Sequence, residues 1–254
     1  MSSLFAGPIG IAYQIVFWIS HLLTPLTGGL ATAAAIVAFT VGVRLLLAPL
    51  SFFGMRGQAR IAAIQPRVQE LRTRYARQPD RLQSELGALY AQEAGGLLGG
   101  CLPLLLQLPF FSIMYQLFLH RTVAGKPNGL LSETLLGTPL GSHWLTGAGV
   151  ASVHGLVFLG LFALLAVAAT LSVRVARAAA PAAGAEVSGA MGAITRLLPY
   201  TTLIIAALVP LAAGLYLLTT TTWTVLERRV LRRAIVTAPV ANRGASVRRA
   251  GSAH

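Results

Sequence analysis

Charged residues, and acidic ones above all, are scarce in this chain. Of its 254 residues only 7 are Asp or Glu, and 11% are charged, against about 25% in ordinary soluble domains. Hydrophobic residues make up 55% of the sequence. This composition excludes a typical soluble domain. It predicts an all-α integral membrane protein, because a helix satisfies its own backbone hydrogen bonds in lipid.

Groups that could support catalysis or hold a metal ion are sparse as well. The single cysteine, Cys101, excludes an internal disulfide. It has no histidine nearby, so we interpret it as a small packing residue. The sequence has no paired carboxylates, no Walker loop and no Ser-His-Asp order. We therefore expect a protein that is not an enzyme and that uses no metal or cofactor.

Residues 1–27 carry no charged side chain. A secretory signal would begin with a basic region, and a transit peptide would be rich in arginine, so we expect the N-terminus to be retained. Ile11, Ile15, Ile19 and the aromatic Trp18 follow helical spacing. This spacing favours an interfacial helix at 1–28, on the outer face of the membrane, over a disordered apolar leader.

The sequence contains long apolar runs that carry almost no charged residues. Five of them are candidate transmembrane helices, at 29–53, 98–119, 150–173, 194–209 and 211–227. The last two could instead form one over-long helix. Pro210 lies between them, and a proline in a helix interior breaks or kinks the helix.

Basic residues decide between four spans and five, since they collect on the cytoplasmic side. Seven arginines lie in 54–97, three between 174 and 196, and seven in the tail 228–254. The loop 120–149 holds only Arg121 and Lys126. Five spans with the N-terminus outside place all three arginine groups in the cytoplasm, and 174–193 becomes a cytoplasmic loop. Four spans would separate Arg196 from the tail.

The cytoplasmic segment 54–97 has its own pattern. Ile61, Ile64, Val68 and Leu71 recur at helical spacing, and so do the apolar residues after 81. A turn at 77–80 separates the two runs. We predict a helical hairpin with one apolar seam and an exterior rich in arginine, including Arg60, Arg67 and Arg74.

Arg44 lies within the first span. An arginine at mid-membrane costs roughly 2.5–3.5 kcal/mol on insertion scales, and no carboxylate lies near it in the sequence. Two interpretations stay open. Arg44 faces a wet cavity or a partner, or its long side chain stretches to the interface six residues away.

Several short motifs occur in one order along the chain. They are Val43-Arg44 with Pro49-Leu50, Gln65-Pro66, Gly99-Gly-Cys-Leu-Pro103, Gln107-Leu-Pro109, and Pro210 followed by Gly214-Leu-Tyr216. In this order and spacing the set resembles the YidC-type membrane protein insertases, in the short five-span form of Gram-positive bacteria. The resemblance covers residues from about 10 to 233.

The resemblance implies a bacterial plasma-membrane protein whose five helices surround a hydrophilic groove open to the cytoplasm. Arg44, Thr40, Gln107 and Tyr216 would line the groove, and the arginine-rich hairpin would receive clients. For Gln107, a hydrogen bond between helices is an equal alternative. Leu217 departs from the family, which often has a second aromatic residue there.

The implied function is that of an insertase and foldase acting on nascent membrane proteins, with the C-terminus in the cytoplasm. The basic tail suits either ribosomal RNA or anionic lipids. The Sec translocon is a further candidate partner. A small anion transporter or channel is the alternative function. It is disfavoured by the lack of an intramembrane carboxylate and of a repeated half.

Overall fold

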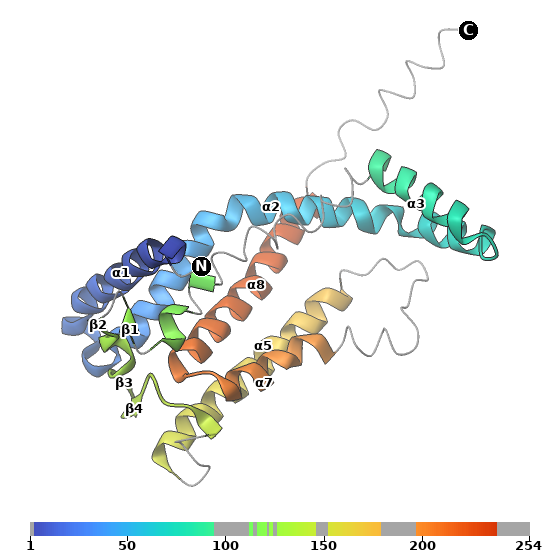
Figure 1. Cartoon of the computed structure of the whole chain (residues 1–254). Helices are drawn as coiled ribbons and strands as arrows, with labels where there is room; N and C mark the ends of the chain where they lie inside the picture. Colours follow the sequence, from blue (N-terminus) through green and yellow to red (C-terminus); the bar gives the residue numbers. More distant parts are fainter. Residues whose placement is uncertain are drawn as a thin grey trace.

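The computed structural model describes residues 3–93, 112–113, 116–120, 122–123, 126–145, 152–178 and 197–237. Within these ranges most of the chain is helical (Figure 1). Most of the predicted span 98–119, most of the predicted loop 174–193 and the tail beyond 237 lie outside the described residues.

Helix α1 (Ser3–Thr27) fills the segment for which an interfacial helix was predicted. It packs along the first part of α2 (Ala31–Arg74), to which the short 3₁₀ turn η1 (Gly28–Leu30) connects it (Figure 1). Val16 is buried in this contact, while Ile11, Trp18 and Leu22 are exposed. An outer face this apolar fits a lipid environment better than water.

Helix α2 is continuous through the predicted boundary at 53–54, so the first span and the first hairpin helix form one element. It contains Pro49 and Pro66, and Figure 1 shows it changing direction along its length. Prolines account for such bends, because each removes a hydrogen bond and crowds the preceding turn.

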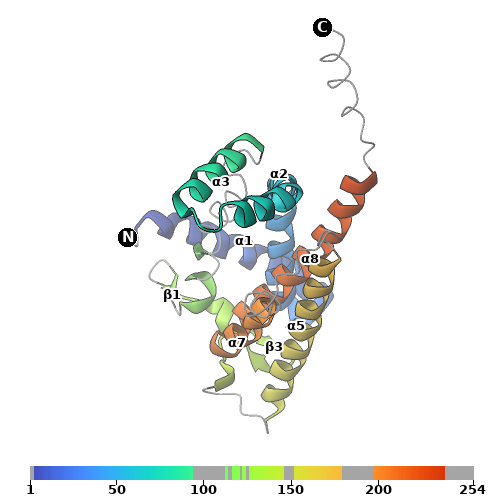
Figure 2. The same cartoon turned by 90° about the vertical axis from the view of Figure 1, so that its right-hand side faces the viewer.

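The hairpin closes where α3 (Pro79–Glu93) folds back on the end of α2 (Figures 1 and 2). Ile64 and Val68 are each 3% exposed and pack against apolar residues of α3. Leu71 is only half-buried, at the margin of this seam. The separate small core explains how a charged segment holds its shape outside the main bundle.

The segment between the second and third predicted spans contains two tight strand pairs. They are β1 (Thr122–Val123) with β2 (Lys126–Pro127), and β3 (Thr134–Leu135) with β4 (Thr138–Pro139); the 3₁₀ turn η2 (Gly129–Leu131) lies between the pairs. Leu136 and Gly137 have φ values of 51° and 83°, the left-handed conformations that two-residue hairpin turns require.

This loop also caps the last helix. The first N–H groups of α8 (Leu211–Thr237) have no partners within their own helix. Leu211 donates to the carbonyl of Ser142 at 3.0 Å, and Ala212 donates to the carbonyl of Leu140 at 2.9 Å. The loop is therefore fixed to the bundle rather than lying free above it.

The third predicted span appears as α5 (Val153–Arg177), whose N-cap Ser152 accepts a hydrogen bond from the N–H of Gly155 at 3.0 Å. In the fourth, whose residues 194–196 lie outside the described residues, the turn η4 (Leu198–Tyr200) leads into α7 (Thr201–Leu208). The chain is extended at Val209, and α8 begins after Pro210. A single over-long helix is thereby excluded.

Length and hydropathy single out two helical stretches that could cross a membrane, Gly7–Met55 and His154–Arg177, within the described part of the chain. Leu198–Leu208 is a shorter apolar helix. These are consistent with an all-α membrane protein, and the count of five spans stays a prediction.

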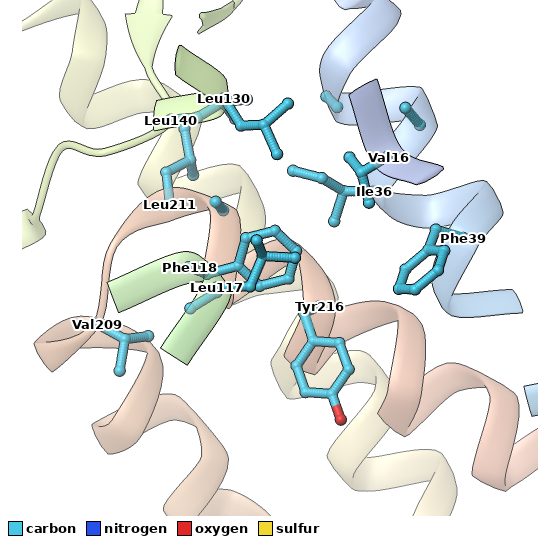
Figure 3. Close-up of a cluster of buried hydrophobic side chains, with 14 of the residues drawn as sticks. Val16, Ile36, Phe39, Leu117, Phe118, Leu130, Leu140, Val209, Leu211 and Tyr216 are labelled. Atoms are coloured by element: carbon cyan, nitrogen blue, oxygen red, sulfur yellow. The ribbon is translucent and has the colours of Figure 1, made fainter. Parts of the chain in front are cut away.

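One core joins α1, α2, α5, α7 and α8 to the loop (Figure 3). Ile36, Leu117, Leu140 and Leu211 are all fully buried, and the rings of Phe118 and Tyr216 lie 6.4 Å apart. The core occupies the loop end of the helices. Polar residues of α2 and α8 begin beyond it, toward the hairpin end.

Candidate functional site

Helices α2 and α8 each carry a stripe of polar side chains along one face. Thr40, Arg44 and Ser51 share one face of α2, at positions i, i+4 and i+11. On α8 a second stripe follows the same spacing. Its members stand at positions i, i+4, i+7 and i+11 and are Tyr216, Thr220, Trp223 and Glu227. The two helices contact one another. We call these seven residues the polar seam.

Arg44 lies at the middle of the polar seam. Its side chain is half-buried, and its charge interacts with the side chains of Tyr216 and Glu227. Ser51, two turns further along α2, contacts the Glu227 carboxylate. The seam thus joins residues about 180 positions apart in the sequence, and places a carboxylate in the electrostatic field of Arg44.

Thr40 and Tyr216, both predicted groove residues, are nearly closed off from solvent. Thr40 is 1% exposed, and its hydroxyl donates to the carbonyl of Ile36 at 2.7 Å. Tyr216 is 5% exposed and packs against Phe118. These two residues form the floor of the seam, where it meets the apolar core.

The stripe on α8 carries polar atoms that the described residues do not satisfy. Thr220 Oγ1, Trp223 Nε1 and Glu227 Oε1 are all buried without a hydrogen-bond partner in that part of the chain. Thr220 lies near the Tyr216 hydroxyl, and Trp223 lies near Glu227, but neither approach completes a hydrogen bond for these atoms. Three such atoms on one helix face are unusual, because buried polar groups are nearly always paired.

Other threonines of α8 behave differently. The hydroxyls of Thr219, Thr221 and Thr224 each donate to a carbonyl one turn earlier, at 2.7–2.9 Å. Such bonds to the own helix satisfy a hydroxyl locally. Of these four threonines, only Thr220 lies on the polar-seam face of α8, and its buried hydroxyl has no hydrogen-bond partner among the described residues.

The remaining predicted site residues lie elsewhere. Gln107 is outside the described residues. Arg60, Arg67 and Arg74 are exposed on the hairpin part of α2, and the guanidinium of Arg74 lies 5.9 Å from the ring centre of Tyr75. They form a surface separate from the polar seam.

Sequence reasoning missed Ser51 and Glu227. Glu227 lies at the very end of the last apolar run, far from Arg44 in the sequence. The usable signal was the spacing from Tyr216 through Thr220 and Trp223 to Glu227, which defines one helix face. The described residues contain no group of three or more His, Cys, Asp or Glu side chains placed to hold a metal ion.

The part of the chain that contains the polar seam is also similar to known proteins. The sequence profile of the family described as 60Kd inner membrane protein matches residues 22–238, which is most of the chain. Three similar proteins all carry the name membrane protein insertase YidC. The one from Helicobacter pylori is 39% identical over 82 residues, which is 32% of this chain and 15% of that protein.

The other two matches are similar in extent. The protein from Chlorobium limicola is 35% identical over 104 residues, 41% of this chain and 18% of its own length. The protein from Chlamydia caviae is 36% identical over 103 residues, 41% of this chain and 13% of its own length. The matched segment is thus less than a fifth of each of these relatives. With the profile spanning most of its length, the chain belongs to the 60Kd inner membrane protein family, and its resemblance to the YidC-type insertases is confirmed.

Proposed function

We propose that this protein is a membrane protein insertase and foldase, and that the polar seam is the groove along which the polar part of a client moves. The observation that carries the proposal is the row of three buried polar atoms on α8 that have no hydrogen-bond partner among the described residues, opposite the stripe of Arg44 on α2. Relatives in the same family bear the name insertase.

Helix packing alone does not explain why α8 places three such polar atoms on one buried face. Each buried polar atom without a partner costs about 1–3 kcal/mol, and an apolar residue at the same place would avoid that cost. Water or a passing polar chain supplies the missing partners in a hydrated groove. The neighbouring threonines bond to their own helix, so the exception is specific to the face that meets α2.

Arg44 gives the groove its charge. Two unit charges about 4 Å apart attract by about 1 kcal/mol in water and by about 4 kcal/mol near a protein surface. An acidic residue in the translocated tail of a client would therefore be drawn to Arg44 more strongly than to an arginine in solution. Membrane potential adds about 2.3 kcal/mol per charge per 100 mV, and it favours outward movement of negative charge.

The apolar core at the loop end closes the groove on the outer side. Leu140, Phe118 and Leu211 fill that end, so a client tail would cross only part of the hydrocarbon thickness inside the protein. The client's own apolar span then enters the lipid. Each apolar residue gains about 0.3–0.6 kcal/mol on insertion, which supplies the driving force without covalent chemistry.

The proposed topology places the N-terminus outside and the hairpin and C-terminus in the cytoplasm of a bacterial cell. The exposed arginines 60, 67 and 74 would meet the nascent client first. The basic tail would contact the ribosome or anionic lipids, and the Sec translocon is a further proposed partner. We expect a protein that needs no cofactor for this work.

Reconstitution tests the proposal. The purified protein is placed in liposomes, and a single-span client with an acidic tail is added. The account predicts that the tail becomes protected from external protease, and that protein-free liposomes give no protection. Uptake of a small anion without client insertion would instead support a transporter. The Arg44–Glu227 interaction makes that alternative worth measuring in the same vesicles.

A further inference from the structure

Glu227 belongs to the polar seam through its buried oxygen, but its negative charge has no role in the function proposed above. It lies on α8 at the hairpin end of the polar seam and is half-buried. One of its oxygens, Oε1, is buried without a hydrogen-bond partner in the described part of the chain. A carboxylate held in this way is costly, so its position calls for an explanation.

The surroundings of the carboxylate are defined by both helices. Ser51 of α2 and Trp223 of α8 face it, and the charges of Arg44 and Arg228 act on it. Arg228 is exposed, so its charge is screened by solvent. Arg44 is half-buried, and its charge is the one that acts from within the polar seam.

Glu227 has the same chemistry as the group that Arg44 is proposed to attract in a client. A carboxylate on the protein and a carboxylate on a client tail cannot both neutralise one guanidinium fully. Because both sit along one seam, each lowers the electrostatic gain available to the other.

We propose that Glu227 is the resting counter-ion of Arg44, and that an acidic client displaces it. This inference rests on the proposed insertase function. Glu227 thereby sets how much negative charge a client tail must carry before Arg44 favours it. It is a specificity-determining residue: it tunes which tails enter and has no role in the driving force.

Glu227→Gln tests the inference, since glutamine keeps the shape and the hydrogen-bonding groups of the side chain while removing its charge. The clients are one single-span protein with three tails that differ only in three residues: all Glu, all Gln or all Lys. Removal of the competing charge should raise insertion of the acidic tail by about two- to fivefold, the range that an ion pair near a surface supplies. Insertion of the neutral tail should not change, and insertion of the basic tail should fall.

Two controls separate charge from structure. Glu227→Asp retains the charge and should keep the relative preference of the unmodified protein among the three tails. In an Arg44→Ala background, Glu227→Gln should lose its tail-dependent effect, because the counter-ion then has nothing to neutralise. Ser51→Ala, which removes one contact to the carboxylate, should shift insertion in the same direction by a smaller factor and serves if Glu227→Gln fails to fold.

The outcomes are distinct. An equal change for all three tails, or a tail-dependent effect that persists without Arg44, would overturn the counter-ion role while leaving the insertase intact. Absence of any insertion by the unmodified protein would overturn the proposed function and this inference with it.

Discussion

Thr220 is the residue at which the proposed hydration of the polar seam can be examined most simply. Its hydroxyl is buried and unpaired within the described residues, whereas those of Thr219 and Thr221 are bonded to their own helix. Thr222 is exposed on another side of α8, because two residues correspond to about 200° of rotation.

Thr220→Cys, in a background where Cys101 is replaced by serine, should react with a membrane-impermeant maleimide added from the cytoplasmic side. A thiol must ionise in water before it reacts, so labelling reports hydration. Thr222→Cys is the matched control at nearly the same depth, and it should be labelled at least about tenfold more slowly if it faces lipid. Equal protection of both positions would show that the seam is dry.

At the scale of single residues, the sequence singled out Arg44 and Tyr216, which the structure brings together in the polar seam, but it missed Ser51 and Glu227. Arg44 was visible because a charge interrupts an apolar run. Glu227 could not be recognised in this way, because its importance depends on the contact between α2 and α8, which are distant in the sequence. Periodicity assigns a residue to a helix face, but it does not reveal which helix lies opposite.

The contact between α5 and α8 depends on a small residue. A Cβ added at Gly214 would lie 2.6 Å from Cδ2 of Leu161, and Leu161 is itself only 4% exposed. The leucine therefore has little room to move. Small residues at such crossings let helices approach closely in membranes.

Gly214→Ala should destabilise the bundle by about 1–3 kcal/mol, the usual cost of overpacking. Gly160→Ala on α5 is the control: nothing lies within 4 Å of its added Cβ, so its stability should stay unchanged or rise. Thermal unfolding in detergent measures both. Identical melting temperatures for the two variants would contradict the close approach at Gly214.

The hairpin has a core of its own, and it can be weakened separately. Val68→Asp places a charge in a site that is 3% exposed, where an unpaired charge costs about 2 kcal/mol or more. We expect faster proteolysis between α2 and α3 with unchanged melting of the membrane bundle. Gln69→Asp, at an exposed neighbouring position, should leave proteolysis as it was.

At the scale of elements, apolar periodicity indicated the two helices of the hairpin and a helix close to α5, whose crossing of the membrane stays a prediction. It placed a boundary inside α2, because the change from apolar to charged residues at 53–54 alters the environment of a helix without ending it. It also missed the strand pairs of the loop, whose two-residue strands are too short to show alternation.

At the scale of the whole molecule, the loop and its core close one end of the helices, and the polar seam runs toward the hairpin at the other end. Ser132 of the loop and Ser84 of α3 are both exposed serines. In a background without Cys101, Ser132→Cys should be labelled from outside the cell and Ser84→Cys only after the membrane is opened. Labelling of both from the same side would contradict the proposed orientation.

The central claim is that the charge of Arg44 acts on client tails through a hydrated groove. It is tested most directly by inserting two clients that differ only in tail charge, with matched amounts of unmodified, Arg44→Lys and Arg44→Ala protein. The account predicts that Arg44→Ala lowers insertion of the acidic tail about five- to tenfold and spares the neutral tail, since Coulomb attraction is strengthened in a low-dielectric site. Arg44→Lys should retain most of the activity, because it keeps the charge and loses only the planar fork. Equal loss for acidic and neutral tails would contradict the account and leave Arg44 as a structural residue.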